Sequence, residues 1–347
     1  MPYQVTLQPG GKAFSVDEGE AVLQAAHRQG IQLSHDCRSG SCGTCRARLV
    51  SGRVHYPQGP PLAITALEMQ QAEILLCRAV PLNDIALDVR EITAVAELVV
   101  KTLPCRIVRM ERLAHDVEAL YLKLPAVERL SFLPGQYIDV LLADGHRRSF
   151  SLANPPHDDS LLELHVRHVP GGRFTTEVFE KLHEGALLHI QGPLGTFFLR
   201  EDTARPILMI AGGAGFAPFK AMLRHVFEQG PQRQVEFYWG ARARRDLYAG
   251  WLVKKWLASH PGFKYVPVLS EPLPSDHWSG RTGFVHAAVL ADHADLSGHD
   301  IYMSGPPPMI TAAQGTFPAH GAAQSRMFSD TFYYAPEVRA ALERGGA

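Results

Sequence analysis

The sequence lacks a surplus of charge of either sign, since 34 Lys and Arg residues nearly balance 35 Asp and Glu residues. Proteins that bind nucleic acid or anionic membranes carry a basic excess, so neither partner is expected. The chain also lacks any run of about 18 apolar residues, so no transmembrane helix is expected. Its first residues, MPYQVTLQPGGKAF, lack the basic start and apolar core of a signal peptide, which predicts a cytoplasmic protein.

Cysteine is scarce too, and the odd count of five argues against a disulfide framework in a cytoplasmic chain. Three of the five, Cys37, Cys42 and Cys45, stand within nine residues of one another. Such clustering indicates a metal site. Cys105 fits no ligand spacing, and we expect it to be a buried thiol in a strand.

Three regions of different pattern follow one another along the chain. Residues 1–95 combine short strands with one helix and form an α+β region, with strands at 3–8, 12–16, 45–49, 75–80 and 84–89 and a helix at 21–29. Residues 96–103 are expected to be a linker.

From residue 104 to 203, many short alternating strands with Gly and Pro turns predict a small antiparallel β-barrel. The expected strands are 105–111, 117–123, 136–142, 148–153, 161–169 and 187–191, with a helix at 175–183. From 204 to 347, short apolar strands alternate with helices, which predicts an α/β region with a parallel sheet. Its expected strands are 207–211, 235–239, 265–269 and 300–303, and its helices 218–228, 246–259, 284–292 and 308–314.

The cysteine loop has the spacing C-x4-C-x2-C, which is typical of plant-type [2Fe–2S] sites. Two irons need four thiolates, and Cys77 on a later strand can add the fourth to Cys37, Cys42 and Cys45. Zinc is the alternative, but zinc sites favour paired C-x2–4-C knuckles and only one such pair is present.

A second motif joins a strand to an anion-binding turn. Arg148-Ser149-Phe150-Ser151 ends one strand, and a later glycine turn at 170–174 leads to Thr175, which stands where a helix N-cap belongs. A glycine-rich turn at a helix N-terminus suits a pyrophosphate. Alone, the first half could equally be a strand edge with a surface arginine.

A third motif combines an apolar strand at 207–211 with the loop Gly212-Gly213-Ala214-Gly215 and a helix beginning near Pro218. This order places a pyrophosphate on the helix N-terminus, although a plain strand–helix turn would look similar. Near the end of the chain, Ser304-Gly305-Pro306 closes another strand before a helix; the alternative is again an ordinary turn.

On these motifs the chain resembles the ferredoxin–NADP⁺ reductase superfamily, in the branch with an N-terminal plant-type ferredoxin domain. The Cys-Arg-x-Gly-x-Cys-Gly-x-Cys loop and the Arg-Arg-Ser-aromatic-Ser segment are similar to those of CDP-6-deoxy-Δ3,4-glucoseen reductase-like proteins, and the domain order resembles reductase components of oxygenases. The resemblance implies a β-grasp [2Fe–2S] ferredoxin domain (1–95), a linker (96–103), a Greek-key FAD-binding β-barrel (104–203) and an NAD(P)H-binding α/β domain (204–347).

The resemblance also implies roles in flavin binding. Arg148 would hold the pyrophosphate, Phe150 would pack on the isoalloxazine, and Ser151 would hydrogen-bond near N5. The remaining expected FAD contacts, largely through the backbone, are Leu152, His165, Val166, Arg167, Gly172 and Thr175. The family usually has Tyr where this chain has Phe150, so one hydroxyl is lost.

For the nucleotide, the resemblance implies contacts from Gly212, Gly213, Ala214, Gly215, Gly240, Arg242, Ser304, Gly305 and Pro306. Ser304 stands where the family has a Cys beside the nicotinamide, and Phe332 is expected to approach the flavin. Ser151, Ser304 and Phe332 are therefore the expected catalytic residues. Arginines near 242–245 could grip a 2′-phosphate, but the Asp-Leu-Tyr at 246–248 resembles NADH-using relatives, so NADH is expected rather than NADPH.

The implied activity is hydride transfer from NADH to FAD, followed by single-electron transfer through the cluster to a protein acceptor. The acceptor would be an oxygenase or dehydrase component, and the reductase a monomer. Two alternatives stay open. One is a self-standing NADH:acceptor reductase for ferric iron or small molecules. The other is a non-catalytic redox-sensing module, because Phe150, Ala214 and Ser304 depart from the family pattern.

Overall fold

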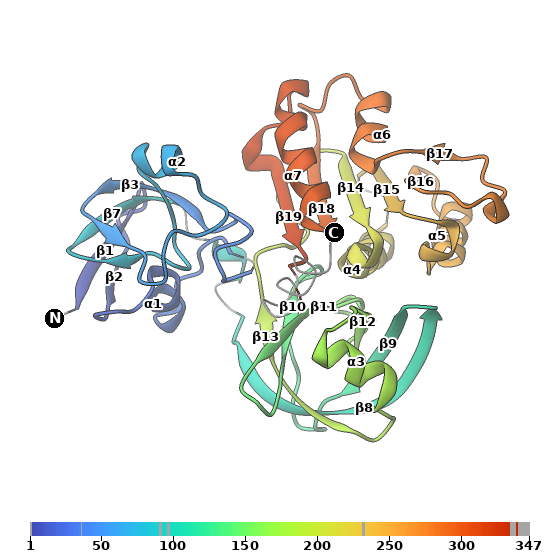
Figure 1. The fold of residues 1–347 in the computed structure, drawn as a ribbon, viewed down its shortest axis with the longest axis horizontal. Coiled ribbons are helices and arrows are strands. Elements are labelled where there is room, and N and C mark those ends of the chain that lie inside the picture. The colour runs from blue at the N-terminus through green and yellow to red at the C-terminus, as the bar shows by residue number, and fades with distance from the viewer. Residues whose placement is uncertain are drawn as a thin grey trace. The chain divides into compact units, whose positions relative to one another are not determined.

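A computed structural model describes residues 2–35, 37–89, 92–95, 98–230, 233–333 and 338 (Figure 1). The chain divides into two compact units, Met1–Leu98 and Val99–Ala347. Among the described residues, no helix combines the length and the apolar character needed to cross a membrane.

The first unit is a five-stranded mixed sheet packed against one helix. The sheet order is β2-β1-β7-β3-β5, and β1 and β7 run parallel while the other pairs are antiparallel. Apolar side chains of alternate strand residues pack on the helix and form a single core. The elements are β1 (Tyr3–Gln8), β2 (Ala13–Val16), α1 (Val22–Arg28), β3 (Arg46–Ser51), β4 (Val54–His55), α2 (Ala66–Gln70), β5 (Glu73–Leu75), β6 (Val80–Pro81), β7 (Ile85–Asp88) and a 3₁₀ turn at Thr93–Val95.

Three features of this unit differ from the sequence prediction, the first being strand β4, which was not predicted and pairs with β6 in a separate two-stranded sheet. The strand expected at 75–80 is interrupted after Leu75, because the next residues turn to bond the start of α1: the N–H groups of Val22 and Leu23 donate to the carbonyls of Ala79 and Leu76, each at 3.0 Å. Helix α2 was not predicted, although a Thr-x-x-Glu capping box at residues 65–68 marks its start.

The second unit begins with a six-stranded antiparallel sheet in the order β11-β10-β13-β8-β9-β12. An isolated bridge between Leu152 and Leu164 joins its two ends, which closes the sheet into a barrel. The barrel elements are β8 (Lys101–Ala114), β9 (Val117–Lys123), β10 (Tyr137–Leu141), β11 (Arg147–Ser151), β12 (Leu162–Arg167), α3 (Arg173–Glu180) and β13 (Leu187–Leu194).

The barrel also departs from expectation at two boundaries. β8 starts at Lys101, inside the range expected as linker, because its first residues pair with β13; residues 96 and 97 lie outside the described residues. α3 starts at Arg173 with Gly172 as its N-cap, so Thr175 was wrongly expected at the cap.

The rest of the unit is a six-stranded parallel sheet in the order β17-β16-β15-β14-β18-β19. Alternate strand residues face two separate cores, so α4 and α5 cover one face and α6 and α7 the other (Figure 1). The order of the strands reverses between β14 and β18: from β14 the chain continues to β15 and β16 on one side of the sheet and later returns to β18 on the other side. The carboxyl ends of parallel strands at such a point form a crevice that binds ligands.

The elements of this sheet domain are β14 (Ile207–Gly212), α4 (Phe216–Gln229), β15 (Val235–Ala241), α5 (Gly250–Ser259), β16 (Phe263–Leu269), β17 (Arg281–Thr282), α6 (Val285–Asp292), β18 (Asp300–Gly305), α7 (Pro307–Thr316) and β19 (Met327–Thr331), with 3₁₀ turns at Gly213–Gly215, Arg244–Asp246, Pro274–Asp276, Phe317–His320 and Gln324–Arg326. Helix α4 begins two residues before Pro218, which was expected to open it. Helix α5 begins at Gly250 rather than at 246, because the preceding residues form a 3₁₀ turn. The three predicted fold classes are otherwise confirmed.

Candidate functional site

The cysteine loop gathers backbone donors around one sulfur. Three N–H groups, those of Ser39, Ser41 and Cys42, point at the Sγ atom of Cys37 at 3.3–3.4 Å. The hydrogen bond with Cys42, helped by those of Ser39 and Ser41, outweighs burial and lowers the pKa of Cys37 to about 5. This thiol is therefore poised to act as the thiolate that iron requires.

Two further candidate ligands come from the ends of two paired strands. Cys45 precedes β3 and Cys77 follows β5, and the carbonyl of Cys45 accepts a 3.0 Å hydrogen bond from Leu76. The two thiols interact directly, which lowers the pKa of Cys77 and raises that of Cys45. Thiols from the loop and from the β5 turn with backbone donors beside them fit a [2Fe–2S] cluster. Cys105 lies on β8 in the second unit, where burial raises its pKa to about 12, as befits a structural thiol.

The flavin motif lies at the end of β11. Arg148 and Phe150 are half-buried, and the Phe150 ring packs against Phe174 of α3 with centroids 5.5 Å apart. Leu152 and Val166 are buried in the barrel core, so only their backbone can face a ligand.

The N-terminus of α3 supplies the anion-binding part of this motif. Gly172, the N-cap, has no side chain to cap the helix, and the hydroxyl of Thr175 turns back to donate to the Gly172 carbonyl at 3.1 Å. Uncapped first-turn amides are a donor set that fits a dinucleotide pyrophosphate, whereas the Arg148 guanidinium donates to the Arg147 carbonyl at 2.8 Å.

A buried carboxylate that the sequence reasoning missed joins the two expected catalytic serines. The hydroxyl of Ser151 donates to Oδ2 of Asp330 at 3.0 Å, and that of Ser304 donates to the same oxygen at 3.4 Å. All three residues are buried. The next residue but one, Phe332, is half-buried and donates its N–H to the Gly305 carbonyl at 2.9 Å. In the sequence, the only feature that could have identified Asp330 as a site residue is its position two residues before Phe332.

The glycine loop at 212–215 lies where the order of the parallel strands reverses. Ala211 is in register with Ser304, and a Cβ atom on Gly215 would lie 2.0 Å from the Ser304 carbonyl oxygen, so only glycine fits there. The indole of Trp239 donates to the Gly213 carbonyl at 3.0 Å and holds the loop from β15. A glycine loop pressed into this crevice, with Ala214 at its tip and Pro306 as the N-cap of α7, fits a nicotinamide dinucleotide.

The residues expected near the adenosine half of the nucleotide are more dispersed. Gly240 is in register with Gly212, and Arg242 is exposed just beyond the end of β15. The backbone N–H of Arg244 donates to the Asp276 carboxylate at 3.1 Å, and its guanidinium donates to the Asp276 carbonyl at 3.2 Å. Arg244 is therefore engaged within the protein itself.

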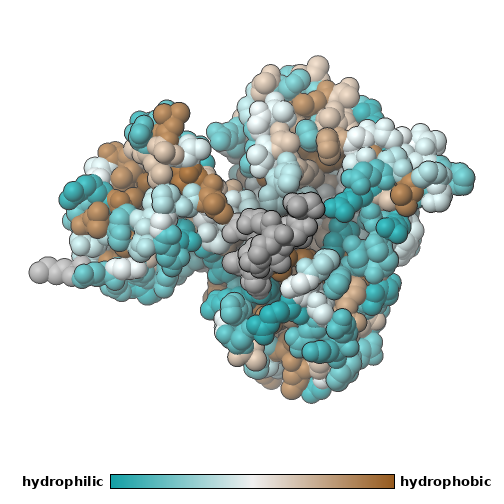
Figure 2. Space-filling model, in the orientation of Figure 1, coloured by the Kyte–Doolittle hydropathy of each residue, from teal (hydrophilic) through white to brown (hydrophobic). Residues whose placement is uncertain are grey.

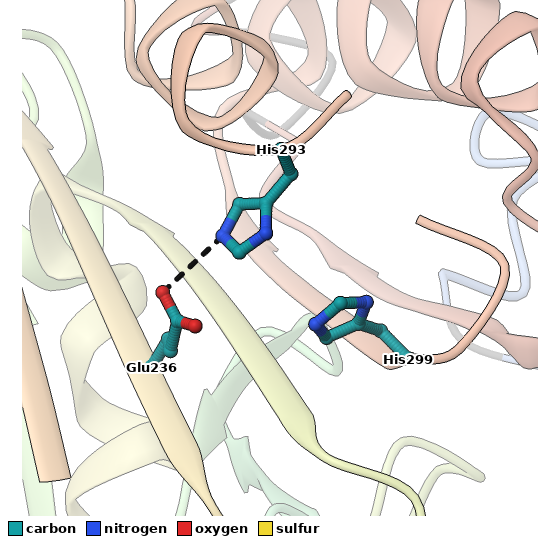
Figure 3. Close-up of side chains that lie close together, drawn as sticks. All are labelled: Glu236, His293 and His299. Carbon is teal, nitrogen blue, oxygen red and sulfur yellow. Dashed lines mark hydrogen bonds and ion pairs between the residues drawn. The ribbon is translucent and has the colours of Figure 1, made fainter. Parts of the chain in front are cut away.

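A separate cluster lies on the parallel-sheet domain, with Glu236 near the start of β15 (Figure 3). The close-up shows His293 and His299 turned toward the Glu236 carboxylate, and Nε2 of His293 lies 3.2 Å from its Oε2. The Lys264 ammonium lies 2.7 Å from that same oxygen and already neutralises it. We therefore regard the cluster as a charge network at the amino-terminal end of the sheet's strands.

Four cysteines that interact as the pairs Cys37–Cys42 and Cys45–Cys77, a barrel with a candidate pyrophosphate site and a parallel sheet with a glycine loop point to an iron–sulfur flavoprotein oxidoreductase. Known sequence families agree: a 2Fe-2S iron-sulfur cluster binding domain matches residues 5–82, an oxidoreductase FAD-binding domain residues 104–199, and an oxidoreductase NAD-binding domain residues 209–315.

Individual relatives match over nearly the whole chain. CDP-6-deoxy-L-threo-D-glycero-4-hexulose-3-dehydrase reductase of Yersinia pestis is 40% identical over 96% of this chain and 99% of its own length. The reductase component of phenol 2-monooxygenase from a Pseudomonas species is 35% identical over 97% of this chain and 96% of its own. The crystal structure of the Amycolatopsis cytochrome P450 reductase GcoB superposes with a TM-score of 0.77 at 32% identity, covering 95% of this chain and 98% of that one. The chain therefore belongs to the ferredoxin–NADP⁺ reductase superfamily, in the branch of NAD(P)H-dependent electron-transfer reductases that carry their own [2Fe–2S] domain.

Proposed function

We propose that this reductase takes hydride from NADH onto FAD and delivers single electrons through its [2Fe–2S] cluster to a partner protein. The observation that carries the proposal is the Asp330 carboxylate, which joins Ser151 of the flavin motif to Ser304 of the nucleotide crevice. Through this shared carboxylate, the expected flavin motif and the expected nucleotide crevice meet at buried polar groups.

Each binding group has a distinct task in this proposal. When bound, FAD accepts two electrons together and the cluster accepts one at a time, which converts hydride chemistry into single-electron delivery. Arg148 and the α3 amides would hold the FAD pyrophosphate. The Ser151 hydroxyl, oriented by Asp330, would face the flavin edge, and Ser304 would position the nicotinamide with Phe332 nearby.

For the partner, we favour a sugar dehydrase, with an oxygenase component as the other candidate. The 40% identical relative is named for a hexulose dehydrase, whereas the 35% identical relative is named for phenol monooxygenase. The first unit exposes large apolar side chains, and apolar surface is visible on it in Figure 2. The exposed residues include Val50, Leu62, Leu67 and Leu82. Apolar surface of this kind suits a protein acceptor better than a small ion.

We further propose that NADH is preferred over NADPH and that the reductase is a monomer. Engagement of Arg244 by Asp276 leaves Arg242 and Arg245 as the exposed candidates for a 2′-phosphate contact. The kcat/KM ratio of NADH to NADPH is expected to exceed about tenfold, a difference of about 1.4 kcal/mol. To test the nucleotide preference, the variant Arg242→Ala should leave NADH turnover unchanged. To test the oligomeric state, sedimentation of the holoprotein should give the mass of one chain.

An anaerobic absorbance titration tests the central proposal. Because FAD takes two electrons and the cluster one, both bands should bleach with about 1.5 NADH per chain. Bands that persist with either nucleotide would favour the redox-sensing module. Fast ferric reduction without any partner would favour the self-standing reductase, whereas rapid transfer to a purified dehydrase or oxygenase alone would support the proposed function.

A further inference from the structure

Strand β12 of the flavin barrel carries apolar side chains on one face and polar or charged side chains on the other. Side chains alternate between faces along a strand, and the apolar set Leu162, Leu164 and Val166 fills the barrel core. The intervening set, Glu163, His165 and Arg167, is polar or charged. Although only half of the strand faces the core, Glu163 and His165 are both buried.

This polar face lies against the nucleotide-binding half of the same unit. Glu163 forms an ion pair with Lys220 of α4, in which the ammonium contacts both carboxylate oxygens. Two positions on, Nδ1 of His165 lies 3.0 Å from the hydroxyl of Tyr248, in the segment before α5. Nε2 of the same imidazole lies 2.9 Å from Oε1 of Glu163, so the contacts form one chain.

Arg167, two positions further, reaches the glycine loop itself. A Cβ atom on Gly213 would lie 2.3 Å from its guanidinium Nη1, and Gly213 adopts a φ of 54°. The guanidinium also pairs with Asp116, with Nε 3.1 Å from Oδ2. Three successive residues of one strand face therefore contact α4, the segment before α5, and the loop between β14 and α4.

The ion pair is deeply buried, since the side chains of Lys220 and Glu163 are only 12% and 7% exposed. Burial raises the pKa of Glu163, but the hydrogen bond with His165 and the charge of Lys220 outweigh it and bring that pKa to about 2. The carboxylate is thus ionised at neutral pH. Buried ion pairs commonly give no more stability than well-packed apolar residues, so geometry is the better explanation for this one.

We propose that Glu163 and Lys220 are a positioning pair for hydride transfer, which fixes α4 and its glycine loop against the flavin strand. Lys220 lies one helical turn beyond Phe216, the first residue of α4, so a shift of its ammonium moves the loop that would carry the nucleotide. The inference rests on the proposed function, because it concerns the distance between nicotinamide and flavin. In this proposal the pair acts through the two elements that it joins, β12 and α4.

The test is single-turnover bleaching of the flavin by NADH in stopped flow, with the FAD-loaded, cluster-loaded full chain. Lys220→Met should slow hydride transfer between about 10- and 100-fold, because misplacement by about 1 Å costs that much, while FAD content and cluster absorbance stay unchanged. Lys220→Arg should retain most of the rate. The double variant Glu163→Leu/Lys220→Met removes both charges but also the buried partner of His165, so it should recover part of the melting temperature lost in Lys220→Met but not the rate.

Lys264→Met is the matched control, since it removes another lysine–glutamate pair in the parallel-sheet domain and should leave the rate unchanged. A double variant that transfers hydride at the wild-type rate would overturn the inference and leave the pair a structural one. So would a Lys220→Met variant of unchanged rate. Failure of the wild-type protein to bleach with NADH would instead count against the proposed function.

Discussion

The hydroxyl of Ser151 lies 3.0 Å from the carboxylate of Asp330, although the two residues are 179 positions apart in the sequence. Ser151 ends a strand of the barrel, and Asp330 lies in the edge strand of the parallel sheet. The same carboxylate oxygen also accepts from Ser304. One buried charge therefore orients a hydroxyl in each of the two binding motifs.

Replacing Asp330 by Asn keeps the shape of the side chain and removes its charge. A hydrogen bond to a charged group is worth about 1.5–3 kcal/mol, so hydride transfer is expected to fall by about 10- to 100-fold. Stopped-flow bleaching by NADH measures the rate, and protein-bound FAD should stay unchanged. Asp158→Asn removes a half-exposed carboxylate paired with Arg224 and should have little effect. Wild-type hydride transfer in the Asp330 variant would limit Asp330 to a packing role.

The sequence predicted the order of the domains and the grouping of the cysteines because both are written in local patterns. The spacing of Cys37, Cys42 and Cys45 is itself the ligand geometry, and strand–glycine loop–helix is a contiguous motif. Asp330 could not be found in this way, because its partners come from other strands, the nearer of them 26 positions away.

Strand β12 shows a second limit of sequence reasoning. Alternation predicts that Glu163, His165 and Arg167 share one face, but not what covers that face. We expected His165 and Arg167 to line the flavin through their backbone, and whether they do stays a prediction. The structure places their side chains against Tyr248 and Gly213, which depends on how the barrel packs on the parallel sheet.

Removing a cluster ligand should separate the two electron-transfer steps. Cys77→Ser is expected to abolish the [2Fe–2S] absorbance, because serine oxygen is a poor substitute for thiolate sulfur on iron. FAD should remain bound and should still bleach with NADH, now at about one equivalent per chain. Cys105→Ser is the control: this buried thiol lies on β8, and its replacement should leave both chromophores in place. An intact cluster spectrum in the Cys77 variant would remove Cys77 from the ligand set.

The stability of the first unit should fall at mildly acidic pH because of His27. Burial, with a smaller contribution from the charge of Arg38, lowers the pKa of His27 from 6.5 to about 4. Between these values the unfolded chain binds a proton that the folded unit does not, so stability is full above pH 6.5 and declines as the pH falls toward 4. At pH 5.5 the loss due to His27 alone is about 1.4 kcal/mol relative to pH 7.5, and burial of the neighbouring His35, which lowers its pKa to about 3, adds a loss in the same direction.

Urea unfolding of the holoprotein, followed by the visible circular dichroism of the cluster, measures this loss. His27→Gln cannot take up the proton, so its stability should change less between pH 7.5 and 5.5 than that of the wild type. His55→Gln, at an exposed position, should behave like the wild type. An identical pH dependence in the wild type and the His27 variant would contradict the prediction.

The glycine loop offers a test of the nucleotide crevice that depends on a single methyl group. Gly215 has helical backbone angles, with φ −59° and ψ −6°, so alanine is acceptable to the local conformation. The conflict is with the neighbouring strand, because the new Cβ would lie 2.0 Å from the Ser304 carbonyl oxygen and 3.0 Å from the Gly305 nitrogen. These are backbone atoms of a buried strand, so the loop must move instead.

Overpacking of this kind costs about 1–3 kcal/mol, and Gly215→Ala should raise the KM for NADH about tenfold or more while FAD stays bound. Gly298→Ala is the matched control, since a Cβ there meets no atom within 4 Å. If Gly215→Ala kept the wild-type KM for NADH, the nucleotide would have to bind elsewhere than the crevice between β14 and β18.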